Sequence, residues 1–210
     1  MVAAVLWDFG GVLLSSPFDA FAAYEREIGL PEGFIRRVNA TNPNTNAWAR
    51  LERSELSLEA FARLFEDEAR ALGGELSGDR VLDLLAGELR PEMVAALRAV
   101  KGAGYRTACL TNNVLGGGDG PEERRRHVSE VMALFDVVVE SSRVGVRKPE
   151  PRFYELACEL LHVRPRECVF LDDLGVNLKP ARAMGMTTIK VVDPAQALAE
   201  LGQVLGLALR

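Results

Sequence analysis

The chain opens with a short apolar run that ends abruptly in a carboxylate. Residues 2–7 are all apolar, and Asp8 and Phe9 lead from them into a pair of glycines. A continuous apolar run of this length is typical of a strand in a parallel sheet, because helices cover both faces of such a sheet. The functional groups of open α/β sheets lie at the carboxyl ends of their strands, so we expect Asp8 to belong to a functional site.

The second half of the chain alternates strand-like and helical segments. We predict strands at 105–110, 136–139, 168–171 and 187–192, and helices at 92–103, from 121, at 149–161, at 177–184 and from 194. This alternation predicts an α/β fold with a parallel sheet and helices on both faces. The glycine-rich run at 116–120 lacks the lysine of a P-loop, so we interpret it as a mobile loop.

Residues 15–90 have a different pattern. Their apolar residues recur at helical spacing, glycines and prolines interrupt them, and no strand-like run is present. We predict an all-helical insertion of four or five helices at 15–90, between two core segments at 1–14 and 91–210. Trp48, Phe61 and Phe65 fall at helical spacing, so we expect them in the core of this insertion rather than in contact with a substrate.

Charge and composition exclude several classes of protein. The net charge of −5 provides no basic surface for nucleic acid or for an anionic membrane. No apolar stretch approaches the roughly 20 residues that span a bilayer. Three cysteines without a CxxC pair fit a reducing compartment. We therefore expect a cytoplasmic protein without nucleic-acid or membrane partners, and the sequence carries no signal for an oligomeric state.

Polar residues follow the predicted strands or the segments next to them. Because the carboxyl ends of parallel strands meet at one edge of a sheet, we expect these residues to lie together. Together they suit phosphoryl transfer: a carboxylate attacks phosphorus, and Mg²⁺ offsets the repulsion between carboxylates and a phosphate dianion. A hydroxyl, an ammonium and backbone N–H groups can bind the phosphoryl oxygens. The residues are Asp8, Thr111, Asn112, Lys148, Asp172 and Asp173.

Four segments resemble, in order and spacing, the four motifs of the haloacid dehalogenase superfamily. They read DFGGV at 8–12, LTNN at 110–113, KPEP at 148–151 and FLDD at 170–173. Segments 144–153 and 170–182 further resemble the phosphatase-domain family that precedes soluble epoxide hydrolases and some acyl-CoA dehydrogenases. The resemblance implies a Rossmann-like, doubly wound sheet of strand order 3-2-1-4-5, with a helical cap inserted after the first motif.

The resemblance also implies a nucleophile and a metal site. Asp8 would form an aspartyl-phosphate. Mg²⁺ would be held by the Asp8 carboxylate, the Gly10 backbone carbonyl and Asp173. Asp172 would not bind the metal directly. It would act through water or by orienting Lys148.

Phosphoryl binding is implied for the second and third motifs. Thr111 and Asn112 would grip the transferring phosphoryl group, and Lys148 would neutralise its charge and that of the nucleophile. We expect Lys148 at the edge of a cleft, where its removal costs little stability. The substrate implied is a small phosphorylated metabolite.

Gly10 departs from the phosphatase pattern of the superfamily. Phosphatases carry a second aspartate two residues after the nucleophile, which protonates the leaving oxygen and then activates water. Glycine transfers no proton, and a positioned acid or base contributes roughly 10²–10⁴-fold in rate. Three interpretations follow: a slow Mg²⁺-dependent phosphomonoester hydrolase, an acid supplied by the cap or the substrate, or a weakly catalytic protein that senses phosphate. Haloacid dehalogenases also lack the second aspartate, but they need no metal, whereas the paired Asp172 and Asp173 suit one.

Overall fold

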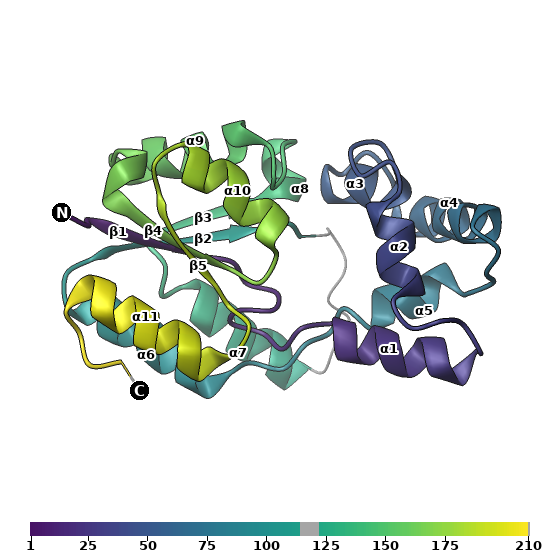
Figure 1. The fold of residues 1–210 in the computed structure, drawn as a ribbon, viewed down its shortest axis with the longest axis horizontal. Helices are drawn as coiled ribbons and strands as arrows, with labels where there is room; N and C mark the ends of the chain where they lie inside the picture. Colours follow the sequence, from purple (N-terminus) through teal and green to yellow (C-terminus); the bar gives the residue numbers. More distant parts are fainter. Residues whose placement is uncertain (114–121, 210) are drawn as a thin grey trace.

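A five-stranded parallel sheet is the centre of the larger of two lobes (Figure 1). The computed structural model describes residues 1–113 and 122–209. The strands are β1 (Ala4–Trp7), β2 (Arg106–Thr111), β3 (Val137–Glu140), β4 (Cys168–Asp172) and β5 (Thr187–Lys190). They lie in the order β3-β2-β1-β4-β5, and each neighbouring pair is parallel. The α/β class and the strand order predicted from the sequence are both confirmed.

Helices connect the strands, and several begin at residues that the sequence marks as helix starts. They are α6 (Pro91–Gly102), α7 (Glu122–Met132), α8 (Ser141–Val144), α9 (Pro151–Leu161), the 3₁₀ helix η1 (Pro165–Glu167), α10 (Gly175–Ala183) and α11 (Pro194–Leu205). Proline begins α6, α9 and α11, at a position where its missing N–H costs no helical hydrogen bond. At α11 the side chain of Asp193 also accepts a hydrogen bond from the backbone N–H of Gln196 at 3.0 Å.

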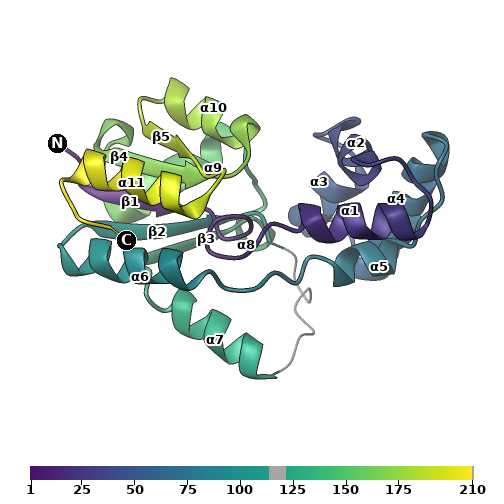
Figure 2. The ribbon, with the colours of Figure 1, turned by 60° about the horizontal axis from the view of Figure 1, so that its bottom comes forward.

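Alternate residues of β1 face two separate cores on opposite sides of the sheet. Val5 and Trp7 pack with apolar residues of α6 and α11. Ala4 and Leu6 pack on the other side with α9 and α10. All four side chains are fully buried, so the strand is apolar without alternation. Figures 1 and 2 show helices above and below the sheet, as a doubly wound fold requires.

The boundaries of some elements differ from the prediction by one or two residues. α9 begins at Pro151 instead of 149, because a residue that precedes proline, here Glu150, is disfavoured in helical conformation and adopts an extended one. α10 begins at Gly175 instead of 177, β2 continues through Thr111, and β5 ends at Lys190. The helix α8 was not predicted, since a four-residue helix has no apolar periodicity to detect.

The smaller lobe consists of five helices around its own apolar core (Figure 2). They are α1 (Phe18–Glu27), α2 (Phe34–Ala40), α3 (Ala47–Glu52), α4 (Leu58–Ala71) and α5 (Gly78–Asp83). The side chains of Asn46, Ser57 and Ser77 cap α3, α4 and α5 by accepting a backbone N–H three residues later. Phe61 and Phe65 of α4 are fully buried and stack with ring centroids 5.2 Å apart, as expected for core residues.

Two backbone segments run side by side between the lobes. The backbone N–H of Ser15 donates to the carbonyl of Glu88 at 2.8 Å, and the N–H of Arg90 donates to the carbonyl of Leu13 at 2.9 Å. Both connections therefore leave the larger lobe close to the loop that follows β1. This pairing places the helical lobe next to the carboxyl edge of the sheet.

Residues 116–120, interpreted above as a mobile loop, lie outside the described residues. Residue 121, at which a helix was predicted to begin, lies outside them as well, and α7 is described from Glu122. None of the helices in the described ranges is long and apolar enough to cross a membrane.

The separate core of the helical lobe gives a prediction for stability. Phe61→Ala should lower the free energy of unfolding by about 3–5 kcal/mol, because it removes a fully buried ring from a packed cluster. Leu160→Ala, at a side chain that is 55% exposed on α9, is the control and should change it by less than about 0.5 kcal/mol. Urea denaturation followed by circular dichroism measures both. Equal, small effects would contradict a packed core in this lobe.

Candidate active site

The carboxyl ends of three neighbouring strands bring the predicted site residues together. Asp8 directly follows β1, Thr111 ends β2, and Asp172 ends β4. The backbone N–H of Asp8 donates to the carbonyl of Leu171 at 2.9 Å, which continues the pairing of β1 and β4 past the end of the strand. The central place of β1 in the sheet is therefore what puts Asp8 between the other two.

Lys148 lies between two of these carboxylates. Its Nζ is 2.7 Å from Asp8 Oδ1 and 2.8 Å from Asp172 Oδ2. Burial opposes the ammonium form, but the two carboxylates outweigh it and raise the pKa of Lys148 above its ordinary value. The ring of Phe170 lies 5.8 Å from Nζ and adds a cation–π contact. The lysine is therefore held charged and fixed in position.

The burial of Lys148 corrects one expectation. The sequence suggested a lysine at a cleft edge with little structural weight, but only 1% of this residue is exposed. The difference arises because tertiary contacts bring the loop between α8 and α9 against Asp8, Asp172 and Asn112, and a local sequence pattern does not indicate how deeply a loop residue is buried. Two buried carboxylates depend on its charge.

Asp172 is held by more partners than the sequence suggested. It is fully buried, and its Oδ1 accepts the backbone N–H of Leu174 at 2.8 Å. The side-chain amide of Asn177 donates to both of its oxygens at 3.1 Å, and the Tyr154 hydroxyl donates to the Asn177 carbonyl at 2.7 Å. Asn177 was not singled out from the sequence, although its place in the first turn of the helix after Asp172 could have suggested it.

Three carboxylates share this one ammonium. Asp8, Asp172 and Asp173 each offer an oxygen, and these oxygens all lie within 4.8 Å of one another. Burial, followed by repulsion from Asp172, raises the pKa of Asp173 to about 6. Burial also raises the pKa of Asp8 well above its ordinary value, although Lys148 opposes the shift. The carboxylates of this cluster therefore carry more negative charge than the one ammonium offsets.

The paired glycines after Asp8 have different structural roles. Gly11 has a φ of +75°, and a Cβ there would lie 2.3 Å from Asp173 Oδ2, so the loop approaches this carboxylate only because residue 11 is glycine. Gly10 has no left-handed backbone, and a Cβ there would meet nothing within 4 Å. A side chain at position 10 would therefore point into open space without strain.

Asn112 uses its side chain inside the protein. Its Oδ1 accepts the backbone N–H of Lys148 at 2.9 Å, and its Nδ2 donates to the Lys148 carbonyl at 3.0 Å. Nδ2 also donates to Glu52 Oε2 at 3.1 Å. The amide is thus a clamp on the backbone of Lys148. The Thr111 hydroxyl, by contrast, has no hydrogen bond to any residue in the described ranges, and Thr111 lines the cavity described below.

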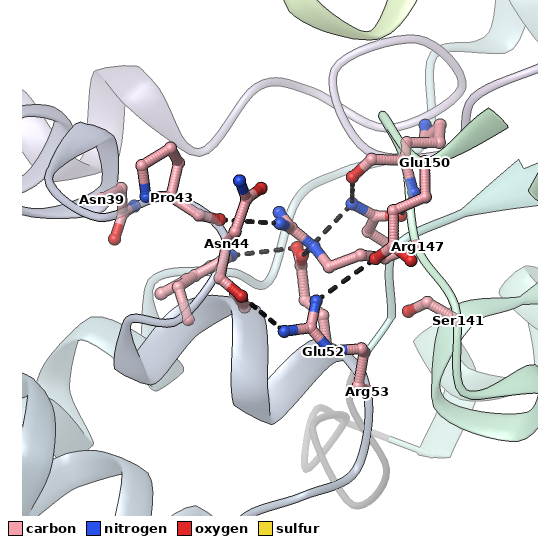
Figure 3. Close-up of polar contacts among 12 residues, drawn as sticks. Asn39, Pro43, Asn44, Glu52, Arg53, Ser141, Arg147 and Glu150 are labelled. Carbon is pink, nitrogen blue, oxygen red and sulfur yellow. Dashed lines mark hydrogen bonds and ion pairs between the residues drawn. The ribbon is translucent and has the colours of Figure 1, made fainter.

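Glu52, from the end of α3, brings the helical lobe to the strand ends (Figure 3). Its Oε2 accepts hydrogen bonds from Asn112 and from the guanidinium of Arg147, and its Oε1 accepts the indole N–H of Trp48 at 3.0 Å. Burial raises the pKa of Glu52, and Arg147 opposes this shift. No sequence signal pointed to Glu52, because it lies 95 positions before Arg147 in the chain. Arg147 adjoins the predicted site residue Lys148 but was assigned no role from the sequence.

A cavity of about 1280 Å³ opens between the sheet edge and the helical lobe. The helical lobe lines it with a mixture of aromatic, aliphatic and charged side chains. Trp48 is half-buried: it packs against the core of the helical lobe, as predicted, with its ring edge-on to Phe61 at 5.3 Å, and it also lines this cavity. The site residues on its wall are Asp8, Gly10, Thr111, Asn112, Lys148 and Asp173, and those from the helical lobe include Phe18, Phe21, Arg36, Trp48, Glu52 and Leu58.

A family model described as haloacid dehalogenase-like hydrolase matches residues 2–185. The chain is a haloacid dehalogenase-like hydrolase. The match covers the whole helical lobe and every site residue from Asp8 to Asn177, which confirms the resemblance seen in the sequence motifs.

Curated relatives include phosphatases and larger proteins. The chain is 36% identical to acyl-CoA dehydrogenase family member 10 of Mus musculus and 34% identical to bifunctional epoxide hydrolase 2 of Sus scrofa. Each alignment covers 98% of the present chain. It spans only 19% and 39% of those two proteins. It is 32% identical to a phosphatase of Mycobacterium tuberculosis, with 97% of each chain covered.

Solved structures share the fold at lower identity. A haloacid dehalogenase family enzyme of Bacteroides thetaiotaomicron, in complex with magnesium and inorganic phosphate, has a TM-score of 0.57 and 18% identity over 90% of this chain and 94% of that one. A dehalogenase with an intermediate complex has a TM-score of 0.66 and 20% identity over 100% and 98%. The fold thus serves both phosphate-binding and dehalogenating proteins.

The burial of Lys148 predicts a large cost for its removal. Lys148→Met should lower the free energy of unfolding by about 3–5 kcal/mol, because it leaves Asp8 and Asp172 buried without a counter-charge. Adding Asp172→Asn should recover part of the loss, since one of the two unpaired charges is then removed. Urea denaturation of the single and double variants measures this. A loss below about 1 kcal/mol for Lys148→Met would contradict the structural weight assigned to the lysine.

Proposed function

We propose that the protein is a Mg²⁺-dependent hydrolase of small phosphomonoesters that acts through an aspartyl-phosphate on Asp8. The observation that carries the proposal is the meeting of three carboxylates and one buried ammonium at neighbouring strand ends, on the wall of a cavity. A full-length relative named as a phosphatase supports it, as does a structural neighbour that binds magnesium and inorganic phosphate.

Asp8 is suited to in-line attack on phosphorus. The Phe9 backbone N–H, at 2.6 Å, and the Lys148 ammonium both donate to Oδ1, so we assign the other oxygen, Oδ2, as the nucleophile. Oδ2 forms a bond to phosphorus while the bond from phosphorus to the ester oxygen breaks, and the ester oxygen keeps the electron pair. Water then attacks the phosphoryl group and releases inorganic phosphate from Asp8.

The carboxylate cluster fits a divalent cation. Its donors are all oxygens, and their charge exceeds that of the single ammonium, which is the environment that Mg²⁺ prefers. We propose Asp8, Asp173 and the Gly10 carbonyl as ligands. When bound, the metal would supply positive charge that offsets repulsion between these carboxylates and a phosphate dianion.

The remaining site residues are assigned to phosphoryl binding and to positioning. We propose that the Thr111 hydroxyl and the Asn112 backbone N–H bind phosphoryl oxygens, because the Asn112 side chain already holds Lys148. Lys148 offsets the charge on Asp8 and on the phosphoryl group. Asp172 orients Lys148 through its 2.8 Å contact with Nζ.

We propose that residues 15–90 act as a cap on the core formed by 1–14 and 91–210. The cavity lies between the two, and the helical lobe contributes both apolar rings and the guanidinium of Arg36 to its wall. Such a cap excludes water from the reacting groups and selects the organic part of the substrate.

A metal in this cluster predicts a specific effect on thermal stability. Mg²⁺ at about 100 times its Kd should stabilise the fold by about 2.7 kcal/mol and raise Tm. Asp173→Asn should abolish this rise and should increase Tm without Mg²⁺, because it removes one of the mutually repelling carboxylates. Asp67→Asn, at an exposed side chain on α4, is the control and should keep the full Mg²⁺ response. Melting curves that are insensitive to Mg²⁺ in the wild type would remove the metal from the proposal.

The glycine at position 10 predicts that the rate of hydrolysis depends strongly on the leaving group of the ester. Without an acid to protonate the ester oxygen, aryl phosphates should be hydrolysed much faster than alkyl phosphates, by roughly 10²–10⁴-fold. Gly10→Asp should raise alkyl phosphate turnover and reduce this difference, since the space and backbone at residue 10 admit a side chain. Gly10→Ala is the matched control, because it adds a Cβ without a carboxyl group.

The same leaving-group series distinguishes the alternatives. Equal wild-type rates on aryl and alkyl phosphates would show that another residue supplies the proton. Phosphate binding without turnover of any ester would contradict the hydrolase and indicate a sensor. Metal-independent halide release from a 2-haloacid would indicate a dehalogenase.

A further inference from the structure

Glu52 is the residue of the helical lobe that contacts both Arg147, in the loop between α8 and α9, and Asn112. Its side chain is 8% exposed and lies where the end of α3 meets the loop between α8 and α9 (Figure 3). It accepts three hydrogen bonds, two from the larger lobe and one from Trp48 of its own lobe. Burial of a carboxylate is costly unless hydrogen-bond and ion-pair partners compensate for the loss of water.

A continuous series of contacts leads from Glu52 to the proposed nucleophile. Glu52 Oε2 holds Asn112 Nδ2, and the Asn112 amide holds both the N–H and the carbonyl of Lys148. Lys148 Nζ in turn holds Asp8 Oδ1. Arg147, the residue before Lys148, is bound by the same Glu52 oxygen and also donates to the Pro43 carbonyl of the helical lobe at 3.1 Å. Both ends of the short segment 147–148 are therefore set by groups that Glu52 orients.

Other contacts join the lobes without reaching Lys148. Arg53 pairs with Glu150 at 3.2 Å, and the Ser54 hydroxyl donates to the Ser142 carbonyl at 2.9 Å. These contacts dock the same end of α3 but involve neither Asn112 nor Arg147. Glu52 thus differs from its neighbours in what its contact controls.

We propose that Glu52 is a positioning residue that couples docking of the helical lobe to the placement of Lys148, through the Asn112 amide. When the end of α3 is docked, the Asn112 amide is held in the orientation that clamps the Lys148 backbone. When it is undocked, Asn112 loses a charged acceptor, and its clamp on the Lys148 backbone is weakened. The proposal rests on the function assigned to Lys148 above, and it places control of that residue in the cap.

The substitution Glu52→Gln tests this at constant side-chain length. Glutamine offers one oxygen and one NH₂ group, so it cannot accept from Asn112, Arg147 and Trp48 in the manner of a carboxylate. We expect kcat/KM for an aryl phosphate, measured with Mg²⁺ and per folded protein, to fall by about 10- to 100-fold. Arg53→Gln is the matched control: it removes a neighbouring contact between the lobes and should change kcat/KM by less than about twofold.

A double-mutant cycle with Asn112→Ala shows whether the effect passes through the amide. In the Asn112→Ala background, Glu52→Gln should lower kcat/KM by less than about twofold, because the clamp is already lost. If the loss of kcat/KM in the double variant equalled the product of the losses in the two single variants, the coupling through Asn112 would be overturned. An unchanged kcat/KM in Glu52→Gln, or an equal loss in Arg53→Gln, would also overturn the proposal, because Glu52 would then act as docking alone.

Hydrogen exchange gives a readout that does not depend on turnover. The Lys148 amide is bonded to Asn112 Oδ1, so its exchange in Glu52→Gln should accelerate at least about tenfold relative to that of Cys109 in β2. Parallel acceleration of both amides would indicate general destabilisation and overturn the coupling. A wild type that lacks phosphatase turnover but shows the selective effect at Lys148 would contradict the proposed function and leave the coupling supported.

Discussion

The buried ammonium of Lys148 is the interaction on which the rest of the site depends. It neutralises part of a carboxylate cluster with which no other lysine or arginine in the described ranges forms an ion pair. It also joins the ends of β1 and β4 through Asp8 and Asp172. Because the lysine is almost fully enclosed, its stem cannot move independently of the loop that carries it. The hydrogen bonds of Asn112 and Asn177 can be understood as the means by which this one charge is kept in place.

The parts of the site that follow from strand topology were predictable from the sequence. An apolar run that ends in a carboxylate indicates a strand end, and β1 at the centre of a parallel sheet brings Asp8, Thr111 and Asp172 to one edge. The fold class follows from the alternation of strand-like and helical segments, whereas the strand order was implied by the family resemblance. The division into a core and a cap, and the role of each site residue, stay predictions that the proposed experiments test.

The parts that depend on tertiary packing were not predictable. Lys148 is buried because the loop before α9 packs against Asp8, Asp172 and Asn112, and a local sequence pattern does not indicate burial of this kind. Glu52 reaches the site because the end of α3 contacts the larger lobe there. The periodicity of apolar residues gives no information on contacts between residues so far apart in the sequence. Trp48 packs against the core of the helical lobe, as its helical spacing predicts, but that spacing did not indicate that Trp48 also lines the cavity.

The two tryptophans of the chain occupy contrasting environments. Trp7 is sealed within the sheet core, whereas the indole of Trp48 lies on the cavity wall and donates to Glu52. The intrinsic fluorescence of the unmodified protein therefore combines the emission of a fully buried indole with that of an indole on the cavity wall. A shift of emission wavelength on ligand addition reports on the cavity, and a soluble quencher distinguishes the two indoles without any attached dye.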